Sequence, residues 1–150
     1  MNHVERAVGL FESGYNCSQA LLAAYGPSFG LTEADALKVA AGFGGGMGCS
    51  GGVCGAISGA FMVIGLKYGA TEPADKTAKY KTYELVLRAL RMFEEQAGSV
   101  NCRELLGFDL GTAEGRQRAR EAGAFDICTQ FVRGAAEILD AVLGEEENGQ

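Results

Sequence analysis

The sequence has no tryptophan, two prolines and one histidine, His3, among its 150 residues. With a single histidine, a histidine-rich metal site and a histidine-dependent catalytic triad are both excluded. No two cysteines stand at CxxC spacing, so zinc-ribbon and ferredoxin motifs have no local support, and without CxxCH covalent haem is not expected. The longest apolar run, Ala60 to Leu66, is far shorter than the ~20 residues that span a bilayer.

Basic residues are also few, with 13 lysines and arginines against 19 acidic residues and a formal net charge of −6. A nucleic-acid binder normally presents a basic face, so this balance argues against that class. The one local group of arginines, at positions 116, 118 and 120, lies beside Glu114 and Glu121 and is typical of a solvated helix face. The first residues, MNHVERAVGLFESG, carry charges where a secretory signal needs an apolar stretch, so we expect a cytoplasmic protein.

Apolar residues recur at helical spacing along most of the chain, and no alternating apolar–polar run is long enough to require a sheet. The pattern predicts an all-α fold, a compact bundle of about six helices in a single domain over residues 1–150. The helix from about Val53 to Tyr68 is apolar nearly all round and is therefore expected to be central and buried.

The other helices are expected to begin near Val4, Asn16, Thr32, Cys102, Thr112 and Phe125. A long helix between Pro73 and Gly98 is predicted to carry an apolar side made of Tyr80, Tyr83, Leu87, Leu90 and Phe93. The last helix is expected to end near Leu143, with residues 145–150 as a frayed tail.

Residues 44–59, GGGMGCSGGVCGAISG, concentrate glycine around two cysteines. Glycine costs conformational entropy in regular structure, so a dense run indicates that the backbone approaches something closely. On the expected central helix, Gly55 and Gly59 form a face almost without side chains. Another backbone can pack closely there, either within the monomer or across a homodimer.

Cys54 lies where this glycine-rich stretch enters the central helix. The unpaired N–H groups and the dipole of a helix N-terminus favour a thiolate, so we expect the pKa of Cys54 to fall. Gly51, Gly52 and Gly55 are expected to leave room around its sulfur for a cofactor or a second thiol. The stretch lacks the lysine of a P-loop and follows a helix rather than a strand, so a nucleotide is not expected.

The chain has five cysteines, and in a reducing cytoplasm these indicate metal binding or redox chemistry more than structural disulfides. The alternative is that they are small buried hydrophobes. Cys17, Cys54 and Cys102 each stand at an expected helix start, and Cys128 follows a short junction at Gly123. We therefore expect four helix starts to point at one centre, where several thiolates would be stabilised together.

The chain resembles the C_GCAxxG_C_C family of redox-active proteins. The resemblance rests on YNCSQALLAAY, AAGFGGGMGCSGGVCGAISGA, MVIGLKYG, SVNCRELLG and FDICTQFVRGAAEIL, and covers almost the whole chain. It implies redox activity and identifies Cys17, Cys54, Cys102 and Cys128 as the family cysteines. Cys49 departs from the family pattern as an additional thiol. A similar helical domain occurs in split-Soret cytochromes, where it looks like the part that holds an iron–sulfur centre.

Three hypotheses follow for the function. In the first, Cys17, Cys54, Cys102 and Cys128 ligate an iron–sulfur cluster or another metal centre for electron transfer to a redox partner protein, because four thiolates suit iron–sulfur or zinc by ligand softness. Zinc is the less favoured of the two.

In the second hypothesis no metal is bound and Cys54 is a low-pKa attacking thiol, with Cys102, Cys128 or Cys49 resolving the mixed disulfide. In the third, the cysteines are packing residues or a structural zinc site in an interaction module.

Overall fold

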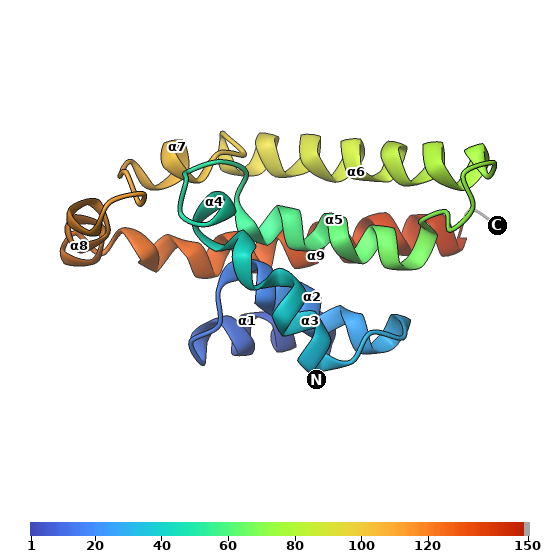
Figure 1. Cartoon of the computed structure of the whole chain (residues 1–150), viewed down its shortest axis with the longest axis horizontal. Helices are drawn as coiled ribbons and strands as arrows, with labels where there is room; N and C mark the ends of the chain where they lie inside the picture. The colour runs from blue at the N-terminus through green and yellow to red at the C-terminus, as the bar shows by residue number, and fades with distance from the viewer. Residues whose placement is uncertain (149–150) are drawn as a thin grey trace.

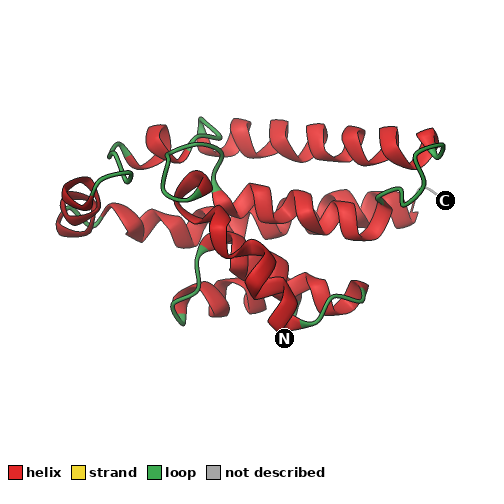
Figure 2. Cartoon of the chain, viewed as in Figure 1, coloured by secondary structure: helices red, strands yellow, loops and turns green. Residues whose placement is uncertain are grey.

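The computed structural model describes residues 1–148, with the side chains of 145–148 excepted. The fold is all-α, and the only pairing of strand type among the described residues is an isolated antiparallel bridge between Val53 and Asn101 (Figure 2). The helices are α1 (His3–Glu12), α2 (Cys17–Tyr25), α3 (Glu33–Ala40), α4 (Gly44–Met47), α5 (Gly55–Tyr68), α6 (Lys76–Ala97), α7 (Cys102–Leu106), α8 (Ala113–Glu121) and α9 (Cys128–Asn148).

The three longest helices, α5, α6 and α9, lie side by side and contact one another, with α6 along one edge of the molecule (Figure 1). The shorter helices α1, α2 and α3 cover the opposite side, where α2 packs on α5 and α1 on α9. The expected end of the last helix is corrected, because α9 continues to Asn148. The tail that we predicted also included residues 149–150, which lie outside the described residues.

Helix α5 is the buried centre that its sequence predicts, and its small-residue face is occupied within the monomer. A Cβ at Gly59 would lie 2.8 Å from Leu21 Cβ and 2.9 Å from the Ser18 carbonyl oxygen. A Cβ at Gly55 would lie 3.1 to 3.4 Å from atoms of three residues, one of them Cys17. These glycines therefore let α2 approach the backbone of α5, which leaves this face no room for a second copy of the chain.

Of the apolar side predicted for helix α6, only Phe93 is buried. The buried residues of α6 are Leu85, Ala89 and Phe93. Tyr80, Tyr83 and Leu87, which we predicted for the core, are exposed. Both stripes have helical spacing, and only contact with α5 and α9 decides which of them is covered.

Tyr25 links α2 to α9 deep in the core. Its hydroxyl lies 2.6 Å from Asp140 Oδ1 and 3.0 Å from the Ala136 carbonyl oxygen. Burial, with a further contribution from the Asp140 carboxylate, raises the pKa of Tyr25 well above its usual value. Within residues 1–148, no helix is both long and apolar enough to cross a bilayer.

Candidate functional site

Each of four cysteines stands at the start of a helix, as the sequence predicts. Cys17, Cys102 and Cys128 are the first residues of α2, α7 and α9, and Cys54 immediately precedes α5. The start of α2 is fixed by a capping box, in which the Asn16 side chain accepts from the Gln19 N–H and the Gln19 side chain accepts from the Asn16 N–H. Local sequence therefore determines where this thiol-bearing helix begins.

The bridge between Val53 and Asn101 ties two of these helix starts together. The Cys54 N–H donates to the Val100 carbonyl and the Cys102 N–H to the Gly52 carbonyl, each at 2.7 Å. Cys54 and Cys102 each directly follow a bridged residue. This pairing brings together segments 48 residues apart in the chain (102 − 54), a contact that helical periodicity does not predict.

The four thiols line one cavity of about 130 Å³. Cys54, Cys102 and Cys128 are buried and Cys17 is half-buried. Apart from Asn16 and the thiols, the walls are glycine backbone and apolar side chains, namely Gly45, Gly55, Phe11, Leu105, Leu106, Leu110, Phe125 and Phe131. The sequence analysis did not identify this apolar lining, which comes from five separate segments.

One wall of the cavity is shaped by a left-handed helical turn. Five consecutive residues, 45 to 49, have φ between +62° and +71°. L-residues reach this conformation only at a cost of about 1–2 kcal/mol each, so the glycine run is needed here for its positive φ. Hydrogen bonds from the N–H groups of Cys49, Gly51 and Gly52 to the carbonyls of Gly44, Gly45 and Gly46 hold the turn.

Gly46 is the tightest point between this turn and the site. A Cβ there would lie 2.5 Å from the Gly52 carbonyl oxygen and 2.7 Å from Cys102 Cβ. The turn, labelled α4, therefore packs directly against the first residue of α7 (Figure 1). Glycine at position 46 allows this approach by its conformation and by its lack of a side chain.

The glycines that we expected to surround the sulfur have different roles. Gly55 lines the cavity, whereas Gly51 and Gly52 do not. A Cβ at Gly51 would lie 2.9 Å from Arg103 Cβ, and one at Gly52 would lie 3.2 Å from the Gly46 carbonyl oxygen. Gly51 and Gly52 thus allow close packing against Arg103 and Gly46. The glycine that lines the cavity together with Gly55 is Gly45.

The thiols of Cys17 and Cys128 interact within the cavity, where the Cys17 S–H stabilises a thiolate at Cys128. This interaction lowers the pKa of Cys128 below that of an ordinary thiol, against the opposing effects of burial and Asp126. It raises the pKa of Cys17 well above its usual value, together with burial and the other thiols. Cys128 is therefore the thiol of this pair that ionises first.

The prediction that the pKa of Cys54 falls is wrong. Burial raises it to about 11, although the backbone N–H groups of Ala56 and Ile57 act in the opposite direction. Burial likewise raises the pKa of Cys102 to about 12, with smaller contributions from Cys54, Cys128 and Cys49. Desolvation in the apolar cavity raises the pKa of these thiols more than the helix N-terminus lowers it. Desolvation depends on the groups that surround the sulfur, and not on the position of the cysteine in its helix.

Cys49 does not line the cavity. It lies on the left-handed turn with φ +65° and is half-buried. A Cβ at Gly45 would come within 2.6 Å of Cys49 Sγ, so the fifth sulfur packs against this glycine of the cavity wall. Cys49, the cysteine that departs from the family pattern, therefore lies next to the site but does not line it.

A model of the family described as "Putative redox-active protein (C_GCAxxG_C_C)" matches residues 15–142. No curated protein and no solved structure matches the chain at a significant level. The match contains all four cavity cysteines and the whole glycine-rich turn. The chain therefore belongs to the C_GCAxxG_C_C family of redox-active proteins.

Proposed function

We propose that this protein is an electron carrier that holds an iron–sulfur cluster on Cys17, Cys54, Cys102 and Cys128. The observation that carries the proposal is that four thiols, one from each of four helix starts, line a single cavity. Four cysteine sulfurs are the usual ligand set of such clusters. A cavity of about 130 Å³ is roughly ten times the ~10–15 Å³ that one water needs, so it suits a group of several atoms.

A structural zinc ion ranks below a cluster in this proposal. Zinc–sulfur bonds of about 2.3 Å in a tetrahedron hold the sulfurs roughly 3.8 Å apart. Among the described residues, no three His, Cys, Asp or Glu side chains are placed to hold a metal ion. A cluster distributes its ligands over several irons and therefore tolerates thiols that are spread around a larger cavity.

The protein contributes the surroundings of the thiols. The backbone N–H groups of Ala56 and Ile57 act to lower the pKa of Cys54, because N–H dipoles near a sulfur stabilise negative charge on it. Phe125, Phe131 and Leu110 exclude water from the cavity. A bound cluster supplies one-electron redox chemistry, and its potential depends on hydrogen bonds to sulfur and on burial.

The proposal is tested by metal and sulfide analysis, with a visible spectrum, on full-length protein purified without oxygen. We expect iron and sulfide in equal amounts, together with charge-transfer absorption in the visible range. Folded protein that is colourless and stays so after anaerobic reconstitution with iron and sulfide contradicts the proposal. Stoichiometric zinc without colour would instead support the structural-zinc hypothesis.

The interaction between the thiols of Cys17 and Cys128 favours one second candidate, a metal-free thiol–disulfide protein. Cys128, as thiolate, would attack a substrate disulfide, form a mixed disulfide and release one substrate thiolate. Cys17 would then attack Cys128 Sγ and release the second substrate thiol, so that the protein donates two electrons and ends with a Cys17–Cys128 disulfide. It ranks second because the attacking sulfur is buried in the cavity, whereas exchange needs an accessible thiolate.

Mild oxidation of metal-free protein with a small disulfide is expected to join Cys17 to Cys128 before any other pair. Each of these thiols has the largest effect on the pKa of the other, so we expect their sulfurs to need the least movement to form a bond. Peptide mapping by mass spectrometry without reduction identifies the pairing. The Cys49→Ala variant should give the same disulfide, whereas a first product that joins Cys54 to Cys102 would contradict the assignment.

A further inference from the structure

The solvent-facing side of α6 carries an apolar stripe that no helix of the bundle covers. Tyr80, Tyr83 and Leu87 are 61%, 54% and 47% exposed. Their spacing of three and four residues places them on one side of the helix, opposite the buried Leu85 and Ala89. In Figure 1 this helix forms the outer edge of the molecule. Three large apolar side chains in a row on a single exposed face are typical of an interface.

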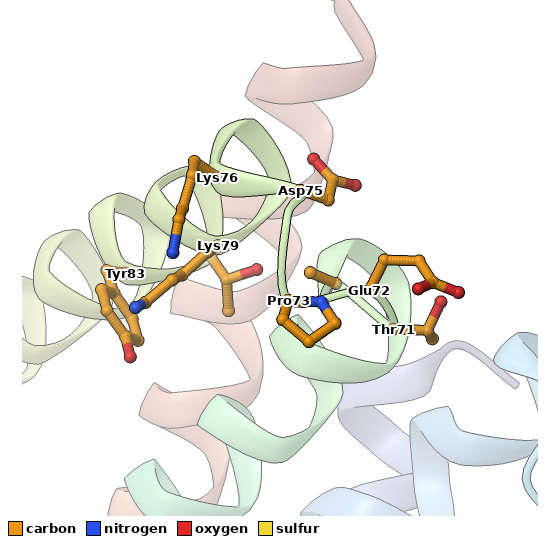
Figure 3. A pocket seen from close by; sticks show the side chains of 10 residues that line it. Thr71, Glu72, Pro73, Asp75, Lys76, Lys79 and Tyr83 are labelled. Atoms are coloured by element: carbon orange, nitrogen blue, oxygen red, sulfur yellow. The ribbon is translucent and has the colours of Figure 1, made fainter.

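The two tyrosines are already arranged as a unit. Their rings meet edge to face with centroids 6.1 Å apart. Lys79 Nζ lies 5.6 Å from the Tyr80 centroid and 5.9 Å from that of Tyr83. Figure 3 shows Lys79 and Tyr83 side by side at the edge of a surface hollow bounded by the 69–75 loop. The aromatic pair therefore stands beside a depression into which a partner side chain can fit.

Four charged residues at the ends of α6 oppose its dipole, although the Asp75 carboxylate at the N-cap complements it. Lys76 and Lys79 occupy its first turn, and Glu94 and Glu95 its last. A helix is stabilised by the reverse arrangement, with acids first and bases last. An antiparallel copy of the same helix would bring its acidic end to these lysines and its lysines to these acids.

We propose that the protein forms a two-fold symmetric dimer through antiparallel contact of α6 with α6 of a second copy. The two-fold axis passes through Leu87. Each residue therefore lies level with the residue of the other copy that is equally far from Leu87 in the opposite direction along the chain. Leu87 then meets itself and Tyr83 lies opposite Arg91. Lys79 lies within one residue of the level of Glu94, which shares its side of the helix. Arg91 would stack on the Tyr83 ring, and each polar pair occurs twice because the interface is self-complementary.

The size of this surface indicates a reversible dimer. A helix of 22 residues is about 33 Å long and about 10 Å wide, which gives a footprint of roughly 300 Å² on each copy. Stable complexes bury about 800 Å² per partner, so dissociation on dilution is expected. None of the residues that line the four-cysteine cavity lies on α6, so the cavity is not part of the interface.

Sedimentation equilibrium of the full-length protein over a range of concentrations tests the proposal. Wild type should be monomeric when dilute and dimeric when concentrated. Leu87→Glu places two like charges on the symmetry axis and should remain monomeric throughout. Val39→Glu, at an exposed apolar residue of α3, is the matched control and should dimerise like wild type. A monomeric wild type at every concentration, or a dimer that survives Leu87→Glu, overturns the proposal.

Charge exchange tests the antiparallel register. Lys79→Glu and Glu94→Lys should each weaken dimerisation roughly tenfold, because each reversal creates two repulsive pairs at the edge of the interface. The double variant Lys79→Glu/Glu94→Lys should restore wild-type association. A double variant weaker than either single variant overturns the antiparallel pairing, since a parallel arrangement brings like residues together.

Discussion

Gly46→Ala is expected to destabilise the protein by about 2–5 kcal/mol and to abolish cluster binding. The first contribution is conformational, because Gly46 has φ +71° and alanine there costs about 1–2 kcal/mol. The second is steric, because the new Cβ would lie 2.5 Å from the Gly52 carbonyl oxygen and 2.7 Å from Cys102 Cβ, at about 1–3 kcal/mol for an overpacked contact. Backbone at Gly52 cannot rotate away, so the turn must separate from α7.

Gly48→Ala is the matched control for this prediction. Gly48 belongs to the same left-handed turn, with φ +62°, but a Cβ there meets only the Gly42 carbonyl oxygen at 3.7 Å. It should therefore show the conformational cost alone, about 1–2 kcal/mol, and still bind the cluster. Urea unfolding of both variants, with iron content of the anaerobic proteins, makes the comparison. Equal losses in the two variants would contradict the role assigned to the contact with Cys102.

Alanine at Cys17, Cys54, Cys102 or Cys128 is expected to lower iron and sulfide content at least about tenfold, because each change removes one of four ligands. Alanine is preferred to serine, since a hydroxyl can replace a thiolate as ligand and leaves a polar group in an apolar cavity. Anaerobic iron and sulfide analysis gives the content, and circular dichroism shows that each variant is folded.

Cys49→Ala is the control within the same chain. Its sulfur lies outside the cavity lining, behind Gly45, so this variant should keep the full iron content. Loss of iron in Cys49→Ala, or its retention in any folded variant of the other four, would contradict the proposed ligand set. Comparing the iron content of the five variants distinguishes cysteines that bind iron from a cysteine that only lies nearby.

Much of the fold follows from local sequence. Asn16 and Thr32 cap helices where we expected them, because a side-chain oxygen accepts from an N–H three residues on. The helix start at Cys17 is predictable for the same reason, whereas Asn101, which precedes Cys102, makes no side-chain cap hydrogen bond. Gly55 and Gly59 also have the predicted packing role, although only the structure identifies α2 as their partner.

The errors concern properties that depend on contacts distant in sequence. The pKa of Cys54 rises because apolar residues of other segments desolvate it, and these are not adjacent in the chain. On α6, two stripes have equally good helical spacing, and burial depends on where α5 and α9 lie. The pairing of Cys17 with Cys128 depends on how α2 meets α9, which no local pattern encodes.

The sequence by itself determined the all-α class, the helix starts and the family, because caps, glycine conformation and helical periodicity act over a few residues. Only the tertiary structure decided which thiols share a cavity, which of them ionises first, and which face of α6 remains open. These depend on desolvation and on contacts through space, and neither is set until distant segments have packed together.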